Sequence, residues 1–184
     1  MTRFGQAPLR VVVTGSECTG KTTLAQAIAE RFVAPWVPES SRLHAEEVAL
    51  REHRELTLAD VQPIARRHLA AEDEALTRAG PLLILDTDLL STVVYSRHYY
   101  GECAAWIEAA ARERLADLYL FCRPDLPWIA DGVRDRPIQR EQIDALFRSR
   151  LDAVGARCVE VVGQGRERTE IGERAVARLL AEAR

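Results

Sequence analysis

A glycine-bounded segment near the N-terminus has the residue types and the spacing needed to hold a phosphate group. Residues 15–22 read GSECTGKT and match the pattern G-x-x-x-x-G-K-[ST] at every fixed position. The two glycines let the backbone turn tightly and direct N–H groups at phosphate oxygens. The ammonium of Lys21 can reach the terminal phosphates, and the hydroxyl of Thr22 is a typical Mg²⁺ ligand. The pattern therefore predicts a site for a nucleoside triphosphate and Mg²⁺.

The nine residues expected to surround the phosphates are Gly15, Ser16, Glu17, Cys18, Thr19, Gly20, Lys21, Thr22 and Thr23. Lys21 is the only lysine in the chain, and every other member of the 25 basic residues is an arginine. A compact ammonium suits such a loop better than a planar guanidinium. The lysine at this position therefore favours a phosphate loop over a chance glycine turn. Cys18 is interpreted as a backbone spacer, with a redox-sensitive thiol as the alternative.

Carboxylates follow two of the apolar runs. Asp86 comes directly after residues 82–85, and Asp88 stands two positions later. The carboxyl ends of parallel strands face the ligand crevice, where a carboxylate can hold Mg²⁺ through water or polarise an attacking hydroxyl. Capping of the next helix is the alternative for both residues. Glu39 and Arg42 follow another short run and could bind a sugar diol and a polar group, or form only a surface ion pair.

Residues 124–137 form a long segment that is rich in proline and charge, which is typical of a functional loop. Its arginines Arg134 and Arg136 could close over a phosphoryl group, stabilise transition-state charge and exclude water. A solvated charged loop is the alternative. The aromatic residues Trp36, Trp128 and Tyr95 could stack on a flat base or belong to the core. The expected substrate-binding residues are Glu39, Arg42, Trp36, Asp88, Tyr95, Trp128 and Asp131.

The composition places the chain among ordinary soluble proteins. It has 184 residues, 47% hydrophobic and 29% charged, with a net charge of −3. No apolar run approaches the ~20 residues of a membrane span, and no global basic field favours nucleic acid. The four cysteines are scattered and the four histidines lack metal-ligand spacing, so a reduced, cytoplasmic location without a zinc cluster is expected.

Apolar periodicity predicts strands that alternate with helices throughout. Strands are expected at residues 9–14, 33–37, 82–85, 117–122 and 158–162. Helices are expected at residues 21–32, 39–54, 57–79, 89–100, 102–115, 138–151 and 166–183. Pro63 fits the third helix if that helix begins near Asp60, because the first turn lacks internal N–H partners. This order predicts an α/β fold with a mostly parallel sheet, in a single domain over residues 1–184.

The motif set resembles the ribosylnicotinamide kinase domain of the NadR-type NAD-salvage family, within the P-loop small-molecule kinases. The matching segments, in family order, are GSECTGKTTL (15–24), VPESSR (37–42), LDTDLLSTVVYS (85–96), LYLFCRPDLPWIADGVRD (118–135) and the turn at 163–168. The phosphate loop is generic, and the PDLPW-x-x-DG-x-RD segment is the specific part.

The resemblance implies a three-layer fold with a five-stranded parallel sheet in the order 2-3-1-4-5 and a lid over residues 124–137. It implies transfer of phosphate from ATP to the 5′-hydroxyl of nicotinamide riboside, giving nicotinamide mononucleotide. Lys21 and Thr22 would handle ATP and Mg²⁺, and Glu39 would face the riboside. Asp86 would orient Mg²⁺ or accept the hydroxyl proton, and residues 163–168 would lie near the adenine. Arg134 and Arg136 would be the lid arginines.

The sequence departs from some relatives at Pro38, where they carry an aromatic residue before the glutamate, with Trp36 two positions earlier here. A kinase for another nucleoside, nucleotide or vitamin alcohol is therefore an alternative, as is a nucleotide-binding regulatory ATPase. A polynucleotide 5′-kinase needs the same crevice, but the acidic net charge counts against it. Any adenylyltransferase step is expected to come from another protein. The oligomeric state and the identity of the general base stay open.

Overall fold

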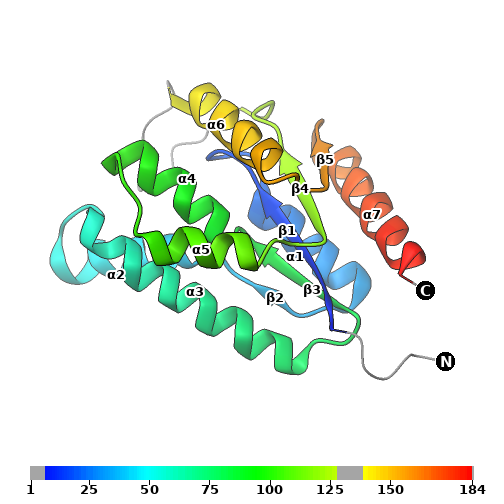
Figure 1. The fold of residues 1–184 in the computed structure, drawn as a ribbon. Helices are drawn as coiled ribbons and strands as arrows, with labels where there is room; N and C mark the ends of the chain where they lie inside the picture. Colours follow the sequence, from blue (N-terminus) through cyan, green and yellow to red (C-terminus); the bar gives the residue numbers. More distant parts are fainter. Residues whose placement is uncertain (1–6, 128–138, 184) are drawn as a thin grey trace.

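The computed structural model describes residues 7–127 and 139–183 (Figure 1). The elements in chain order are β1 (Leu9–Thr14), α1 (Lys21–Phe32), β2 (Trp36–Val37), α2 (Ser40–Glu52), α3 (Leu58–Arg78), β3 (Leu82–Asp86), α4 (Leu89–Tyr100), α5 (Ala105–Glu113), β4 (Leu118–Cys122), α6 (Arg140–Ala153), β5 (Cys158–Val161) and α7 (Gly165–Glu182).

The five strands form one parallel sheet in the order β2-β3-β1-β4-β5. This order confirms the predicted α/β class and the 2-3-1-4-5 arrangement. Strand β1 lies at the centre, with Val13 opposite Asp86 of β3 and Thr14 opposite Phe121 of β4. All carboxyl ends therefore meet at one edge of the sheet, which is where an open α/β sheet binds its ligand.

Helices cover both faces of the sheet. Alternating residues of β1 separate the two core layers, because successive side chains of a strand point to opposite faces. Val11 and Val13 pack with α1 and α7, whereas Val12 packs with α3, α4 and α6. A third cluster joins α5 to α3 and α4 around the fully buried Ile107. Figure 1 shows the resulting layers, with α1 and α7 on one side of the sheet.

The element boundaries differ from the prediction by a few residues at most places. Helix α3 begins at Leu58 and not near Asp60, so Pro63 lies within the helix. Thr57 and Asp60 form a capping box there, which fixes the earlier start. Strand β2 is only two residues long, because Val33 has φ 51° as the C-cap of α1 and interrupts the apolar run. No helix in the described part of the chain is long and apolar enough to span a bilayer.

Candidate active site

The segment between β1 and α1 adopts a tight loop that depends on its two glycines. Gly15 has φ 138°, and a Cβ added to it would lie 2.4 Å from the carbonyl oxygen of Cys122 on β4. Gly20 caps α1 at φ 76°, where a Cβ would meet a methyl group of Leu126 at 3.1 Å. Only glycine accepts both the left-handed backbone and such close packing. The loop therefore presses against β4 and places the N-terminus of α1 at the ligand-binding edge of the sheet.

The lysine of the motif lies inside the loop. Lys21 is only 5% exposed, and its Nζ donates a hydrogen bond of 2.8 Å to the carbonyl of Ser16. The hydroxyl of Thr19 donates to the same carbonyl at 2.9 Å. The ammonium is thus held within the loop that the motif predicts will surround phosphates.

Thr22 and Asp86 are brought into direct contact, although 64 positions separate them. The Thr22 hydroxyl donates to Oδ2 of Asp86 at 2.6 Å, and Asp86 is 1% exposed at the end of β3. A hydroxyl beside a carboxylate is a donor set that suits Mg²⁺, which takes few protein ligands and keeps several waters. Within the described ranges, no group of three histidine, cysteine or acidic side chains could hold a metal ion. The Thr22 and Asp86 side chains thus fit Mg²⁺ in their chemistry, and binding of the ion by them stays a prediction.

A cavity of about 470 Å³ opens beside the loop, between α2, α3 and α4. Such a volume is typical of a small-molecule site. Two of its walls are acidic: Glu17 of the phosphate loop is 6% exposed and Glu39, the N-cap of α2, is 5% exposed. Tyr99 of α4 also lines the cavity and donates a hydrogen bond of 3.1 Å to Glu17. The phosphate loop therefore contributes a side chain to the cavity as well as its backbone to the predicted phosphate site.

Aromatic side chains of α4 form another wall of the cavity. The rings of Tyr95 and Tyr99 lie nearly parallel, with centroids 6.0 Å apart, and Tyr100 lies next to Tyr99. Phe147 of α6 meets the Tyr95 ring edge-on at 5.5 Å. These contacts fix the ring orientations and give the cavity a flat, partly apolar surface on which a planar base can rest.

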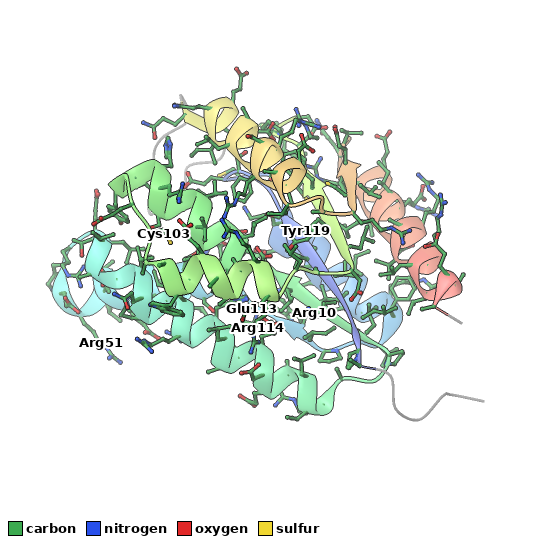
Figure 2. All side chains as sticks on the ribbon, viewed as in Figure 1. Arg10, Arg51, Cys103, Glu113, Arg114 and Tyr119 are labelled. Carbon is green, nitrogen blue, oxygen red and sulfur yellow. The ribbon has the colours of Figure 1, made fainter. Side chains whose placement is uncertain are left out.

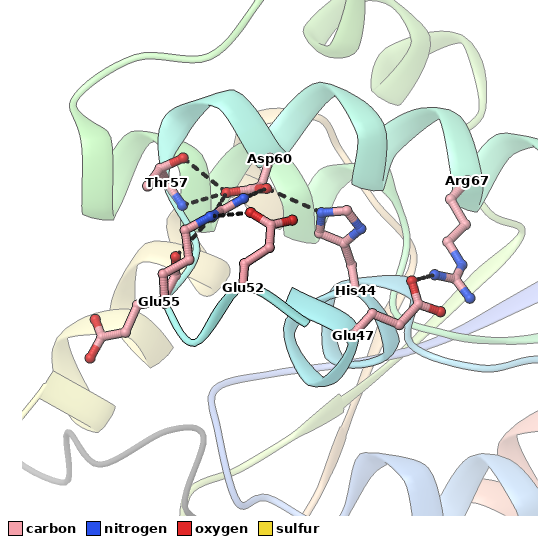
Figure 3. Close-up of polar contacts among 8 residues, drawn as sticks. His44, Glu47, Glu52, Glu55, Thr57, Asp60 and Arg67 are labelled. Atoms are coloured by element: carbon pink, nitrogen blue, oxygen red, sulfur yellow. Dashed lines mark hydrogen bonds and ion pairs between the residues drawn. The ribbon is translucent and has the colours of Figure 1, made fainter. Parts of the chain in front are cut away.

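At the rim of the cavity, between α2 and α3, the carboxylate of Asp60 connects several polar residues (Figure 3). Asp60 accepts two hydrogen bonds from the Arg54 guanidinium, at 2.7 and 3.0 Å, and two more from the backbone and hydroxyl of Thr57. His44 of α2 lies 3.2 Å from the same carboxylate. The Arg54 guanidinium holds the pKa of Asp60 far below its usual range. Because Arg54 and Thr57 line the cavity, this network shapes its entrance.

Asp88 forms a helix cap in the described structure. One oxygen accepts from the backbone N–H of Ser91 at 3.1 Å, and the other accepts from the hydroxyl of Tyr119 at 2.8 Å (Tyr119 is labelled in Figure 2). Burial raises the pKa of the Asp88 carboxyl. These contacts match the capping alternative for Asp88, and a contact with substrate stays a prediction.

The structure gathers some of the expected substrate-binding residues and separates others. Glu39 and Tyr95 line the cavity. Trp36 packs against the core cluster on the α1 side of the sheet, and Arg42 pairs with Glu46 at 3.0 Å on α2, so their roles in binding stay predictions. The expected lid residues fall outside the described ranges, and they are Trp128, Asp131, Arg134 and Arg136.

Two arginines that the sequence reasoning did not single out bind the outside of the phosphate loop. Arg140 of α6 donates to the carbonyl of Cys18 at 3.0 Å, and Arg168 of α7 donates to that of Thr19 at 3.0 Å. Arg140 belongs to no recognisable local motif, and Arg168 ends the segment 163–168, for which the resemblance implied only a place near the adenine. Tyr99, which binds Glu17, was not among the expected site residues. Their roles depend on contacts across 82 to 149 positions, and no local spacing signals such contacts.

Comparison with known proteins found a matching family model and similar proteins. The family model described as "AAA domain" matches residues 10–168, which include the phosphate loop, Asp86 and Arg168. Two curated relatives are the Trifunctional NAD biosynthesis/regulator protein NadR of Escherichia coli (strain K12), 29% identical, and that of Salmonella typhimurium (strain LT2), 28% identical. Each match covers 67% of this chain and 30% of the relative, so the chain spans about a third of their length.

Solved structures show the same fold. A NadR protein in complex with NR has a TM-score of 0.83 and 23% identity, covering 95% of this chain and 52% of that one. A NadR protein in complex with NAD and AMP-PNP has a TM-score of 0.80 and 22% identity, with 95% and 50% covered. Thymidylate kinase from Ehrlichia chaffeensis has a TM-score of 0.65 and 14% identity, with 95% and 100% covered. The arrangement of sheet and helices is therefore shared with nucleotide-handling kinases.

Proposed function

The chain belongs to the AAA domain family, whose model spans residues 10–168, and on that premise we propose that it is an ATP-dependent kinase for nicotinamide riboside. The reaction would move the terminal phosphoryl group of ATP to the 5′-hydroxyl of the riboside and give nicotinamide mononucleotide. The observation that carries the proposal is that one side chain belongs both to the predicted phosphate site and to the cavity beside it. Glu17 belongs to the phosphate loop and also lines the cavity, so an acceptor there would lie beside the phosphates.

The nucleotide half of the proposal rests on the loop and on α1. Backbone N–H groups of residues 15–22 would bind the phosphate oxygens, and the Lys21 ammonium would exchange its bond to the Ser16 carbonyl for the terminal phosphates. Thr22 and Asp86 would hold Mg²⁺, which supplies charge neutralisation at the β- and γ-phosphates. Alternatively, Asp86 would accept the proton of the attacking hydroxyl.

The acceptor half rests on the chemistry of the cavity. The nicotinamide ring of the riboside is a cation, and the carboxylates of Glu17 and Glu39 give the cavity acidic walls that suit a positive ring. The rings of Tyr95 and Tyr99 offer a flat surface for it. The similarity to NadR proteins, one of them solved in complex with NR, supports the same acceptor.

Two further parts of the proposal lie outside the described residues. Arg134 and Arg136 would approach the transferring phosphoryl group and stabilise its charge. Trp128 and Asp131 would complete the acceptor site. The proposal takes this lid from the sequence resemblance alone.

An assay of ADP release with ATP and Mg²⁺ tests the proposal. The acceptor panel contains nicotinamide riboside, nicotinic acid riboside, the common nucleosides, nucleoside monophosphates and thiamine. We expect strong stimulation by nicotinamide riboside, and loss of that stimulation in Lys21→Ala. Arg178→Ala is the matched control, since that side chain is 78% exposed on α7 and pairs only with Glu182 among the described residues.

Each other outcome of the panel has a definite meaning. Stimulation by a different acceptor would keep the kinase chemistry and replace the substrate. Slow turnover that no acceptor changes would favour a regulatory ATPase. Normal transfer by Lys21→Ala would refute the assignment of the phosphate loop.

A further inference from the structure

Two buried arginines donate hydrogen bonds to the phosphate loop from the side that packs against α6 and α7. Arg140 is 9% exposed and Arg168 is 4% exposed, and they come from different helices, α6 and α7. Arg140 donates to the carbonyl of Cys18, and Arg168 donates to the carbonyl of Thr19, each at 3.0 Å. Two successive carbonyls of the loop are therefore held by guanidinium groups.

The same two arginines also hold the segment that follows β4. Arg168 donates to the carbonyl of Arg123 at 2.8 Å and to the carboxylate of Asp125 at 2.7 Å. Arg140 donates to the carbonyl of Leu126 at 2.6 Å. The guanidinium groups thus join the phosphate loop to residues 123–126, which lead into the expected lid.

Backbone geometry gives these contacts a consequence for phosphate binding. In a planar trans peptide the C=O and the N–H of the next residue point in opposite directions. Holding the Cys18 and Thr19 carbonyls against the protein therefore turns the N–H groups of Thr19 and Gly20 the other way, toward the space where phosphates would bind. This is the arrangement in which backbone N–H groups bind an anion.

The arginines also place positive charge directly behind the loop. Arg168 has one carboxylate partner, Asp125, whose side chain is 37% exposed. Arg140 forms no ion pair with any residue in ranges 7–127 and 139–183. The Nε atoms of both arginines are buried without a hydrogen-bond partner in the same ranges. Buried positive charge that carboxylates compensate only in part attracts a polyanion.

We propose that Arg140 and Arg168 are positioning residues for the nucleotide, which orient the N–H groups of Thr19 and Gly20 toward the phosphates and supply two charges behind them. They touch neither nucleotide nor acceptor in this role and act through the loop. The proposal rests on the nucleotide half of the proposed function and makes no assumption about the acceptor.

The test compares AMP-PNP binding by the intact chain and by the variants Arg140→Met, Arg168→Met and Arg168→Lys, without any acceptor. We expect each Met variant to weaken AMP-PNP binding about tenfold or more, because each removes charge-assisted hydrogen bonds from the loop. Arg168→Lys should recover little, because an ammonium cannot reproduce a fork of four bonds. Arg178→Met, on the same helix but with a side chain that is 78% exposed, should bind as the wild type does.

A second readout separates positioning from a general structural role. Where an acceptor is active, the KM for ATP should rise in both Met variants while the KM for the acceptor stays within about twofold of the wild-type value. Binding is measured well below the Tm of each variant. Unchanged AMP-PNP affinity in the two Met variants, or an equal rise of both KM values, would overturn the proposal.

Two outcomes distinguish this inference from the proposed function. If Arg168→Met does not fold, AMP-PNP binding by Arg140→Met decides whether the inference holds, because that variant removes only two described hydrogen bonds. If no acceptor in the panel is phosphorylated but AMP-PNP binding falls as expected, the proposed acceptor fails and the inference stands.

Discussion

The phosphate loop and the cavity beside it are built in different ways. The loop is eight consecutive residues whose backbone does the expected binding, and its geometry depends on φ angles and on the close packing of Gly15 against β4. The cavity is lined by side chains from the loop, α2, the rim before α3, α3 itself and α4. A site made of backbone needs fixed residues at fixed spacing, whereas a site made of side chains needs only that distant segments meet.

This difference predicts how each region responds to substitution. A change in the loop should damage the fold and the activity together, since the loop is part of the sheet's central packing. A change in the cavity should alter its rim or its selectivity and leave the rest of the molecule intact. Three substitutions test the contrast, and they are described from the largest expected effect to the smallest.

Gly15→Ala should cause the greatest loss. The new Cβ would lie 2.4 Å from the Cys122 carbonyl oxygen, on a backbone with φ 138°. Either the loop or β4 must move, and we expect a loss of about 4 kcal/mol in the free energy of unfolding, together with loss of AMP-PNP binding. Urea denaturation measures the first effect and calorimetric titration the second.

Gly80→Ala is the matched control, since nothing lies within 4 Å of a Cβ added there. We expect its free energy of unfolding to change by less than about 1 kcal/mol. If Gly15→Ala were equally mild, the loop would not depend on its backbone in the way described.

Asp60→Asn should destabilise the cavity rim by about 1 kcal/mol at pH 7, because it removes the charge that binds Arg54, whose side chain is 37% exposed and so partly screened by water. The pKa of Asp60 is depressed in the folded protein, so its contribution is present above the unfolded pKa of about 3.9 and is lost as pH falls below that value. The stability gap between wild type and variant should therefore be full at pH 7 and shrink below pH ~4.

The neighbouring pair Glu47–Arg67 provides the control (Figure 3). Its two side chains are 46% and 39% exposed, and surface pairs of this kind contribute little to stability because water screens them. Glu47→Gln should thus change the unfolding free energy little at any pH. If the difference in unfolding free energy between wild type and Asp60→Asn did not decrease in acid, the charge of the carboxylate would not be what stabilises the rim.

Glu17→Gln should have the smallest effect on the fold and a selective effect on the acceptor. The amide oxygen can still accept from Tyr99, so the loop should keep its shape. Loss of the negative charge should reduce the preference for the cationic riboside over a neutral nucleoside about tenfold in kcat/KM, which corresponds to 1.4 kcal/mol. The KM for ATP should stay near its wild-type value.

Glu113→Gln is a suitable control, because Glu113 is exposed on α5 (labelled in Figure 2), away from the residues that line the cavity. It should leave the preference unchanged. An unchanged preference in Glu17→Gln as well would mean that the acidic wall does not select charge, and the contrast between loop and cavity would weaken.

The same contrast explains what the sequence could predict. The alternation of apolar strands and amphipathic helices was sufficient for the α/β class and for most elements, since burial sets those patterns directly. The order of the strands in the sheet came from the family resemblance. Thr22 and Asp86 were each predicted as Mg²⁺ ligands, and the fold brings the two side chains into direct contact. The short β2 was missed, because a positive φ at Val33 overrides local apolar patterning. Helix α3 begins within one residue of its predicted start, but Pro63 lies beyond the first turn in which it was expected.

Contacts between side chains that are far apart in the sequence were not predicted. Trp36 follows the same short run as Glu39, yet strand alternation places its ring against the α1 side of the sheet. Arg140 and Arg168 look like ordinary charges on amphipathic helices, and only the fold brings them to the loop. Asp88 had two plausible roles in the sequence, and the hydroxyl of Tyr119, 31 positions away, supplies a contact that no local pattern contains.

The solitary lysine has a practical consequence for chemical labelling. Because Lys21 is the only lysine and is 5% exposed within the loop, amine acylation of a side chain can occur at one peptide only, and that peptide carries the phosphate-binding motif. Mass spectrometry of that peptide would then report occupancy of the loop by nucleotide, without an engineered probe. Coupling through a lysine side chain, by contrast, would modify the phosphate loop itself, so immobilisation of this protein calls for thiol or carboxyl chemistry.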